Sequence, residues 1–552
     1  MTRSVIDPIT RIEGHMRVEM EVQNGVVTDA WASGGSFRGV ELVVQHRAPE
    51  DAAQIVQRIC GVCPVSHAHA STIAAEKAYG IKISNNARII RNLIEGAQFL
   101  HSHILWFYNL AALDYVNPIH GLEANAADAW DLAVAAGTST NSDFGALKER
   151  LTKFAQNGQL SIFSGNWFDA EDGNAYKLPA ELDLICTAHY LEALKMQARS
   201  SEIAALLGGK MPHVMTIVPG GTAFVPTSQK LDDLKYLIDE VYNWVEATMI
   251  PDTLAIAPYY KDALTFGKGC GRYGAWGVFE APSMQMNDRY LPAGVLDTNL
   301  NLSDVDESKI AEFVGTSWYE GSDVYPAPDF TTKPAFTKYN VNDRYTWCKA
   351  PTYDGEPLET TSLSRILVAY KRNVPFVKEN VDKLLVQLGA ALGTEVPLSA
   401  VQSTLGRVAV RQVETLYIAK LMKDWCAELI EAVKGGDSEY FREPATTTGE
   451  GSGFWEAPRG ALYHSEKVVK GKIEGYQIII PTTWNMAPIN QNGVHGPIEQ
   501  SLIGCPVEDI EKPINALRTV HSYDPCVSCA VHISEPATGK HFETVTNPWG
   551  VK

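Results

Sequence analysis

The chain has 552 residues, of which 45% are hydrophobic and 20% are charged, and its formal net charge is −18. This composition is typical of a globular protein, and the length allows two to four domains. The acidic balance argues against nucleic acid as a partner. No apolar run approaches the roughly 18 residues of a membrane span, and the N-terminus lacks an apolar signal core. We therefore expect no membrane span and no export signal in this chain.

The first hundred residues are predicted to form short strands followed by helices. Residues 16–22 alternate between apolar and polar side chains, residues 23–25 (Gln-Asn-Gly) form a turn, and residues 26–32 return, which indicates a hairpin. Residues 7–15 are predicted to form a loop ahead of it, and residues 37–41 a turn that enters a helix. Helices are expected after that turn. They cover residues 49–59 and 67–79, and a long third helix begins at Ser84, which can cap it.

The rest of the chain is predicted to be mainly helical. Residues 120–175 are predicted to be mixed and turn-rich, residues 255–350 are predicted to be irregular, and residues 446–460 are expected to form a loop. The helices expected here cover residues 179–207, ended by Gly208-Gly209; 228–249, ended by Pro251; and 361–372, 376–392 and 408–434. Residues 466–480 suggest another hairpin. The expected fold class is therefore mainly α with small β-hairpins and sheets (α+β).

Two cysteine pairs lie near opposite ends of the chain, Cys60 with Cys63 and Cys526 with Cys529. Two residues between cysteines let both thiolates face one metal. Four thiolates suit zinc, an iron–sulfur cluster, or nickel with iron. Structural zinc pairs usually lie close together in sequence and staple small modules, whereas this chain has enough apolar residues for its own core. This favours a buried working metal, and convergence of the ends predicts one intertwined domain.

Six short motifs occur in order along the chain. They are R-I-E-G-H at 11–15, F-R-G-V-E at 37–41, R-I-C-G-V-C at 58–63, A-P-R-G at 457–460, P-T-T-W at 481–484 and D-P-C-V-S-C-A-V-H at 524–532. Together they resemble the large, catalytic subunit of nickel–iron hydrogenases of the uptake or respiratory type. The resemblance spans residues 6–532 and implies that family's large helical body. It also implies an oxidoreductase that cleaves dihydrogen reversibly and heterolytically to protons and electrons.

The resemblance implies a nickel–iron centre held by the four cysteines. Cys60 and Cys526 are then terminal nickel ligands, while Cys63 and Cys529 bridge nickel to an iron that carries carbon monoxide and cyanide. Heterolytic cleavage needs a base for the proton, and a nickel-bound thiolate can serve. Cys526 is our choice, because metal coordination removes the proton that a free cysteine, with a pKa near 8.5, keeps at neutral pH.

The resemblance assigns two charged groups next to this centre. Glu13 is the first proton acceptor beyond the thiolate, a role suited to a carboxylate; the alternative for Glu13 is a salt bridge with Arg11 or Arg17. Arg459 lies over the open metal position, where its permanent charge polarises substrate and hydrogen-bonds a cyanide. Asp524 positions this arginine.

Further residues complete the expected site. Pro458 and Thr482 cradle the diatomic ligands, and His67 hydrogen-bonds near the bridging sulfurs. Ser102 stands where the family often has Asp, so one carboxylate near the arginine is expected to be missing.

A second metal site follows from the same resemblance. It consists of Glu41, the backbone carbonyl of Ile478, and His532, and it holds magnesium or an iron-like ion. Two oxygens with an imidazole and waters suit a small hard cation, although the imidazole is unusual.

The resemblance also implies partners. The chain has no further clustered cysteines for an electron relay, so we expect an obligate small subunit with iron–sulfur clusters, forming a heterodimer. Through that subunit, electrons pass to a membrane cytochrome or another acceptor. A maturation endopeptidase is expected to cut after His532 and remove residues 533–552, which leaves a single intertwined catalytic domain over residues 1–532. The location is periplasmic or membrane-associated if the small subunit directs export, and otherwise cytoplasmic.

Four other interpretations remain open. A hydrogen sensor or an inactive precursor of the same family keeps the motifs, although sensors generally lack the cleaved tail. The quinone-site subunit of respiratory complex I has lost the cysteine pairs that this chain retains. A structural zinc protein is the distant alternative.

Overall fold

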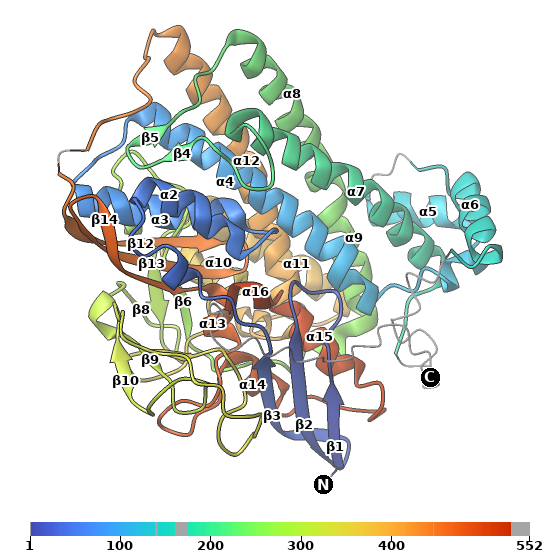
Figure 1. Cartoon of the computed structure of the whole chain (residues 1–552). Coiled ribbons are helices and arrows are strands. Elements are labelled where there is room, and N and C mark those ends of the chain that lie inside the picture. The colour runs from blue at the N-terminus through green and yellow to red at the C-terminus, as the bar shows by residue number, and fades with distance from the viewer. Residues whose placement is uncertain (1, 139–141, 160–174, 445, 531–552) are drawn as a thin grey trace.

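The structure is a computed structural model that describes residues 2–138, 142–159, 175–444 and 446–530, with residues 529 and 530 described by backbone alone. Long helices form the body, and short antiparallel sheets lie along its edges (Figure 1). This confirms the predicted α+β class. The N-terminal sheet and the C-terminal helices α15 (Ile514–Ser522) and α16 (Val527–Ala530) lie together in the lower half of the view.

The predicted N-terminal hairpin is part of a three-stranded sheet. Its strands are β1 (Thr2–Ile6), β2 (Met16–Gln23) and β3 (Val26–Gly34), paired antiparallel in the order β1-β2-β3. Asn24 and Gly25, at the β2–β3 turn, both have positive φ, as a tight hairpin turn requires. The next elements are α1 (Val40–Val43), α2 (Pro49–Ile55), a 3-10 turn (Val56–Ile59), α3 (Pro64–Tyr79) and α4 (Asn85–Ile104).

The cap predicted for α4 is confirmed, because the Ser84 side chain accepts a hydrogen bond from the Ala87 N–H. A π-helix (Leu105–Ala111) continues α4, and short 3-10 helices follow at Ala112–Asp114 and His120–Glu123.

The prediction of a turn-rich stretch over residues 120–175 was wrong in part. This stretch contains α5 (Ala126–Ala136) and α6 (Phe144–Gln156), while residues 160–174 lie outside the described residues. Side chains of Asn125 and Asp143 cap the two helices. Both helices pack on the first half of α7 (Ala180–Gly208) around a small apolar cluster of their own. This cluster projects from the body at the right of Figure 1, so each helix needs only a narrow apolar stripe.

The long helix over residues 179–207 is confirmed as α7, and Gly209 ends it in the left-handed conformation. The end predicted at Pro251 was wrong. Helix α8 (Ser228–Trp244) continues through a π-helix (Val245–Met249) into α9 (Ile250–Ile256). Pro251 lies in the first turn of α9, where a proline is tolerated because an N–H there has no partner within the helix.

The middle of the chain carries short strands and turns. The strands are β4 (Ile217–Val218), β5 (Gly221–Thr222), β6 (Tyr273–Ala275), β7 (Gly294–Leu296), β8 (Leu302–Ser303), β9 (Ile310–Phe313), β10 (Val324–Pro326) and β11 (Ala350–Tyr353). The 3-10 turns are Ala257–Leu264, Met286–Asp288, Glu307–Lys309 and Leu398–Val401. The three helices predicted next are confirmed as α10 (Ser362–Lys371), α11 (Pro375–Leu392) and α12 (Thr404–Lys434).

The loop predicted over residues 446–460 was wrong, because most of it is strand β12 (Gly449–Ala457). It pairs with β13 (Gly460–Val469), which pairs with β14 (Lys472–Ile479) in the predicted hairpin. The glycines of β12 resemble loop signals in the sequence, but they face the backbone of α3. A β-carbon on Gly453 would lie 1.9 Å from the Ala70 carbonyl oxygen, and one on Gly451 would lie 2.2 Å from that of Ala74.

Strand β12 therefore runs along α3 in the opposite direction. Gly449 meets Ala78 near the end of the helix, and Gly453 meets Ala70 nearer its start. The turn after β12, which contains Arg459, consequently lies at the N-terminal end of α3, next to Cys63. The remaining short helices are α13 (Pro481–Asn485) and α14 (Pro497–Leu502).

Candidate metal centre

Three cysteines from the two ends of the chain meet in the buried interior. Cys60 ends the 3-10 turn after α2, Cys63 caps the start of α3, and Cys526 lies one residue before α16. Their sulfurs all lie within 4.8 Å of one another, and the Cys60 and Cys526 sulfurs are 3.2 Å apart. Cys529 lies in α16, but its side chain is outside the described residues. The predicted convergence is confirmed for three of the four cysteines.

Backbone contacts hold the two ends together at this point. The Val527 N–H donates to the Glu13 carbonyl oxygen at 2.8 Å, which gives a parallel bridge between Glu13 and Cys526. Gly14 packs closely, since a β-carbon there would lie 2.6 Å from the Ser528 nitrogen. The N-terminal loop thus forms one wall of the cysteine pocket.

Glu13 points at the sulfurs. One of its carboxylate oxygens lies 3.1 Å from the Cys526 sulfur and accepts a hydrogen bond from the Ser528 N–H at 3.0 Å. Burial chiefly, and next the negative charge of the Cys60 thiolate, raises the pKa of Glu13. The alternative salt bridges do not form, because Arg11 pairs with Asp114 and Arg17 with Asp7 and Glu19.

Arg459 lies in the turn between β12 and β13 and is buried. Its Nη2 is 3.0 Å from an Asp524 oxygen, and its Nη1 donates to the Ser102 hydroxyl at 3.3 Å. Burial opposes the charge, but Asp524 and the thiolates of the three described cysteines outweigh it and raise the pKa of Arg459. The guanidinium therefore stays charged at any working pH.

Sequence reasoning missed a second arginine here. Arg411, on α12, contacts the other Asp524 oxygen at 2.9 Å, and its guanidinium carbon lies 3.9 Å from the ring centre of Trp106. Burial lowers the pKa of Arg411 to about 10, although Asp524 opposes the shift. Two guanidinium groups therefore share one carboxylate, and Ser102 contributes only a neutral hydroxyl. A buried arginine within a helix carries no local sequence signal of its partner.

The other expected neighbours of the cysteines lie close to them or to Arg459. The Thr482 hydroxyl accepts a hydrogen bond from the Cys526 N–H at 3.0 Å. The Pro458 carbonyl accepts one from Arg365 at 2.8 Å, which fixes the turn before Arg459. His67 is buried, and burial lowers its pKa to about 4, so its ring is neutral near pH 7.

Two of the three residues expected at the second metal site come together. A Glu41 oxygen accepts a hydrogen bond from the Ile478 N–H at 2.7 Å. Burial raises the pKa of Glu41 to about 7, with Lys349 opposing the shift. His532 lies outside the described residues, so the ligand set stays a prediction.

A buried carboxylate behind Glu13 was also missed. Asp114 accepts hydrogen bonds from Arg11 at 2.5 Å and from His521 Nδ1 at 2.6 Å. The other ring nitrogen of His521 lies 2.8 Å from the Thr10 carbonyl oxygen. Because both ring nitrogens face acceptors, both must donate, and His521 is an imidazolium. Asp114 therefore ties the N-terminal loop to α15.

Replacing Asp114 with Asn is expected to lower the free energy of unfolding by about 3–5 kcal/mol, because two buried cations lose their shared anion. Burial opposes ionisation of Asp114, but Arg11 and His521 outweigh it and lower its pKa to about 2. An unfolded aspartate has a pKa near 3.9. The stabilisation is therefore complete above about pH 4 and is lost as the pH falls through 2.

Thermal unfolding followed from pH 7 to pH 2 measures both effects. The control is Asp262→Asn, because Asp262 forms a partly exposed pair with Lys177. Unfolding of Asp114→Asn at the wild-type temperature at pH 7 would contradict this account.

A family profile described as nickel-dependent hydrogenase matches residues 38–532, and one described as HoxL-like matches residues 3–32. The hydrogenase-2 large chain of Escherichia coli K12 is 37% identical, with 96% of this chain and 97% of that protein covered. The uptake hydrogenase large subunit of Bradyrhizobium diazoefficiens is 36% identical, with 97% and 96% covered.

Solved structures agree with these matches. The Ni-Fe-Se hydrogenase of Desulfovibrio vulgaris Hildenborough in its reduced state superposes with a TM-score of 0.80 at 35% identity, covering 96% of this chain and all of that chain. A reduced, active Ni-Fe-Se hydrogenase from Desulfomicrobium baculatum gives a TM-score of 0.78 at 34% identity with the same coverage.

Proposed function

The chain belongs to the nickel-dependent hydrogenase family, and from this premise we propose that it is the catalytic large subunit of an uptake or respiratory hydrogenase. It cleaves dihydrogen reversibly and passes the electrons to an iron–sulfur small subunit. The observation that carries the proposal is the convergence of three buried cysteine sulfurs within 4.8 Å, with Glu13 against one of them.

The donor set fits a nickel–iron group. Thiolates select soft and borderline metals, and nickel and iron are among them. Cys60, Cys63, Cys526 and Cys529 would hold nickel and iron between them. When bound, this group supplies the Lewis acidity that polarises dihydrogen. Pro458 and Thr482 would face the carbon monoxide and cyanide ligands of the iron.

Residues of this chain accept and transfer the proton released from dihydrogen. The Cys526 thiolate accepts it and passes it to the Glu13 carboxylate oxygen 3.1 Å away, so the sulfur is deprotonated again and Glu13 becomes neutral. Arg459 remains a cation above the pocket because Asp524 holds it. Its fixed charge stabilises negative charge that develops beneath it.

Three further assignments belong to the same proposal. Glu41, the Ile478 carbonyl and His532 would hold magnesium. An endopeptidase would cut after His532, and a membrane cytochrome or another acceptor would take electrons through the small subunit. Within the described residues, none of the helices combines the length and the apolar character that crossing a membrane requires.

Metal analysis and infrared spectroscopy of the chain purified with its small subunit test the proposal. We expect nickel and iron, infrared bands from carbon monoxide and cyanide, and hydrogen-dependent reduction of a dye. Cys526→Ser is expected to lose nickel and activity, whereas Cys426→Ser, a cysteine on α12, keeps both.

Other outcomes separate the alternatives. Zinc without nickel or iron would indicate the structural zinc protein. A nickel-free chain that still carries residues 533–552 would indicate a precursor, and a loaded centre that signals to a partner with little turnover would indicate a sensor.

A further inference from the structure

A row of hydrogen-bonded side chains leads away from the cysteine pocket between α3 and the β12–β14 sheet. His67 Nδ1 lies 3.1 Å from His464 Nε2, and His464 Nδ1 lies 2.8 Å from the Tyr476 hydroxyl. All three side chains are buried. Imidazole and phenol groups both donate and accept, so such a row can pass protons along itself.

Glu466 continues this row. It stands directly opposite Tyr476 on the neighbouring strand β13, and directly opposed β-carbons lie about 4.5–5.5 Å apart. Glu466 is fully buried, and neither carboxyl oxygen has a hydrogen-bond partner among the described residues. An unpaired buried carboxyl destabilises the fold, so it calls for a functional explanation. The charge of Glu466 acts on the Tyr476 hydroxyl, so the two groups lie close to each other.

The groups around Glu466 place it between the pocket and the surface. The exposed Glu50, in the first turn of α2, acts electrostatically on Glu466 and on the buried Tyr79. Ser71 and Glu41 lie near Tyr476. At the other end, the Cys60 thiolate acts on His67. The row therefore begins at the cysteines and ends near an exposed acid.

We propose that His67, His464, Tyr476 and Glu466 form a second proton path out of the cysteine pocket, separate from the path through Glu13. The inference rests on the proposed function, which supplies the proton. Glu13 lies in the N-terminal loop against Cys526 and Ser528, and the path through it shares no residue with this row.

Each transfer forms one bond to hydrogen and breaks another. A proton binds His67 Nε2 while the Nδ1 proton passes to His464 Nε2. The His464 Nδ1 proton passes to the Tyr476 oxygen, and the tyrosine hydroxyl proton passes to the Glu466 carboxylate. The histidines and the tyrosine stay neutral before and after. Glu466 then releases the proton toward Glu50 and solvent.

The protonation of Glu466 suits this role. Burial raises its pKa to about 8, with the charge of Glu50 adding to the shift. A group with a pKa near the working pH can both accept and release a proton.

Double variants of the complete enzyme test the path. With Glu13 intact, Tyr476→Phe and Glu466→Gln are each expected to lower hydrogen oxidation less than about 3-fold, because the other path stays open. In a Glu13→Gln background, each is expected to lower the remaining rate by about 100-fold or more, the lower end of the range for general acid–base groups. The control Tyr463→Phe removes a buried hydroxyl of the same sheet that bonds Glu307 instead, and it should leave the remaining rate unchanged.

Two outcomes of the kinetics overturn the inference. One is a Glu13→Gln enzyme with no remaining turnover, which would make Glu13 the sole exit. The other is a remaining rate that Tyr476→Phe and Glu466→Gln do not change.

Infrared spectroscopy of the metal-free chain gives a readout independent of turnover. We expect the C=O band of a protonated carboxylic acid at pH 7 that is absent from Glu466→Gln, fades as the pH rises past about 8, and shifts in Tyr476→Phe. Absence of this band, or no shift in Tyr476→Phe, also overturns the inference. A wild-type enzyme that holds nickel and iron yet does not turn over hydrogen would instead refute the proposed function, and the infrared result would still stand.

Discussion

Glu13→Gln is expected to lower hydrogen oxidation by about 100-fold or more, while nickel and iron remain bound. The carboxylate oxygen lies 3.1 Å from the Cys526 sulfur, and general acid–base groups contribute about 10²–10⁴-fold. Glutamine has nearly the same shape, and its side-chain oxygen can still accept the hydrogen bond from the Ser528 N–H. The loop therefore keeps its position, and the loss reports on proton transfer alone.

The measurement is hydrogen-dependent dye reduction, normalised to nickel content. Glu21→Gln is a matched control, because Glu21 lies on β2 and pairs with Arg3. Equal rates for wild type and Glu13→Gln at equal nickel content would show that Glu13 is not the main route by which the proton leaves Cys526.

Gly453→Val is expected to destabilise the protein by about 3 kcal/mol or more and to prevent a normal metal pocket. A β-carbon at this position would lie 1.9 Å from the Ala70 carbonyl oxygen and 2.9 Å from the Ala74 nitrogen. Both are backbone atoms of α3, which cannot rotate away as a side chain can. Overpacking typically costs about 1–3 kcal/mol even where side chains can adjust.

Thermal unfolding measures the loss, and Gly145→Ala provides the comparison. Gly145 lies in α6, where the nearest atom to an added β-carbon is the Asp143 side-chain oxygen at 3.3 Å. Alanine is favoured over glycine inside a helix by about 1 kcal/mol, so this variant should be neutral or slightly stabilised. A Gly453→Val protein that unfolds at the wild-type temperature would contradict the proposed packing of β12 on α3.

The parts of the molecule that could be predicted from sequence are those with local signals. The two C-x-x-C pairs and the surrounding motifs led to the cysteine pocket, with Glu13, Arg459 and Thr482 beside it. Long helices with clear local signals, such as α4 with its apolar stripe and Ser84 cap, were predicted with small errors at their ends. The roles of the site residues, and the ligands from Cys529 and His532, remain predictions.

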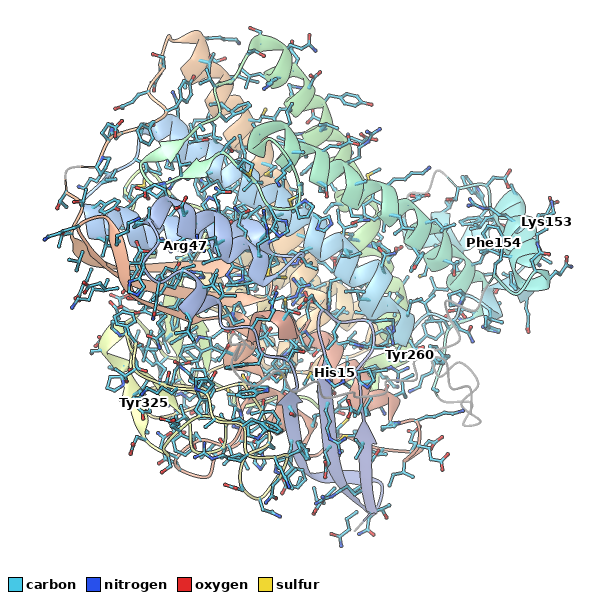
Figure 2. All side chains as sticks on the ribbon, in the orientation of Figure 1. His15, Arg47, Lys153, Phe154, Tyr260 and Tyr325 are labelled. Carbon is cyan, nitrogen blue, oxygen red and sulfur yellow. The ribbon has the colours of Figure 1, made fainter. Side chains whose placement is uncertain are left out.

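The parts that were missed depend on contacts between distant segments. Strand β12 was predicted as a loop because its glycines are favourable only when α3 lies against them. Pro251 was expected to end a helix. It instead lies in the first turn of α9, a position that depends on the π-helix before it. Arg411, Asp114 and His521 meet their partners only after the fold brings α4, α12 and α15 together. Figure 2 shows Lys153 and Phe154 of the missed helix α6 far from His15, which lies beside the Glu13 loop.

In the contact between β12 and α3, glycines at every second strand residue face alanines at every fourth helix residue, and these two repeat distances are similar. Two strand residues span about 6.8 Å and four helix residues about 6.0 Å, so alternate glycines can match every fourth alanine carbonyl. Sliding to the next match would carry Arg459 about 6 Å, well beyond hydrogen-bond reach of Asp524. Small distortions of the contact between β12 and α3 therefore cannot shift the position of the Arg459 guanidinium in small steps. A weakened contact should yield a mixture of fully assembled and fully disengaged molecules, and spectra should resolve two populations instead of one drifting signal.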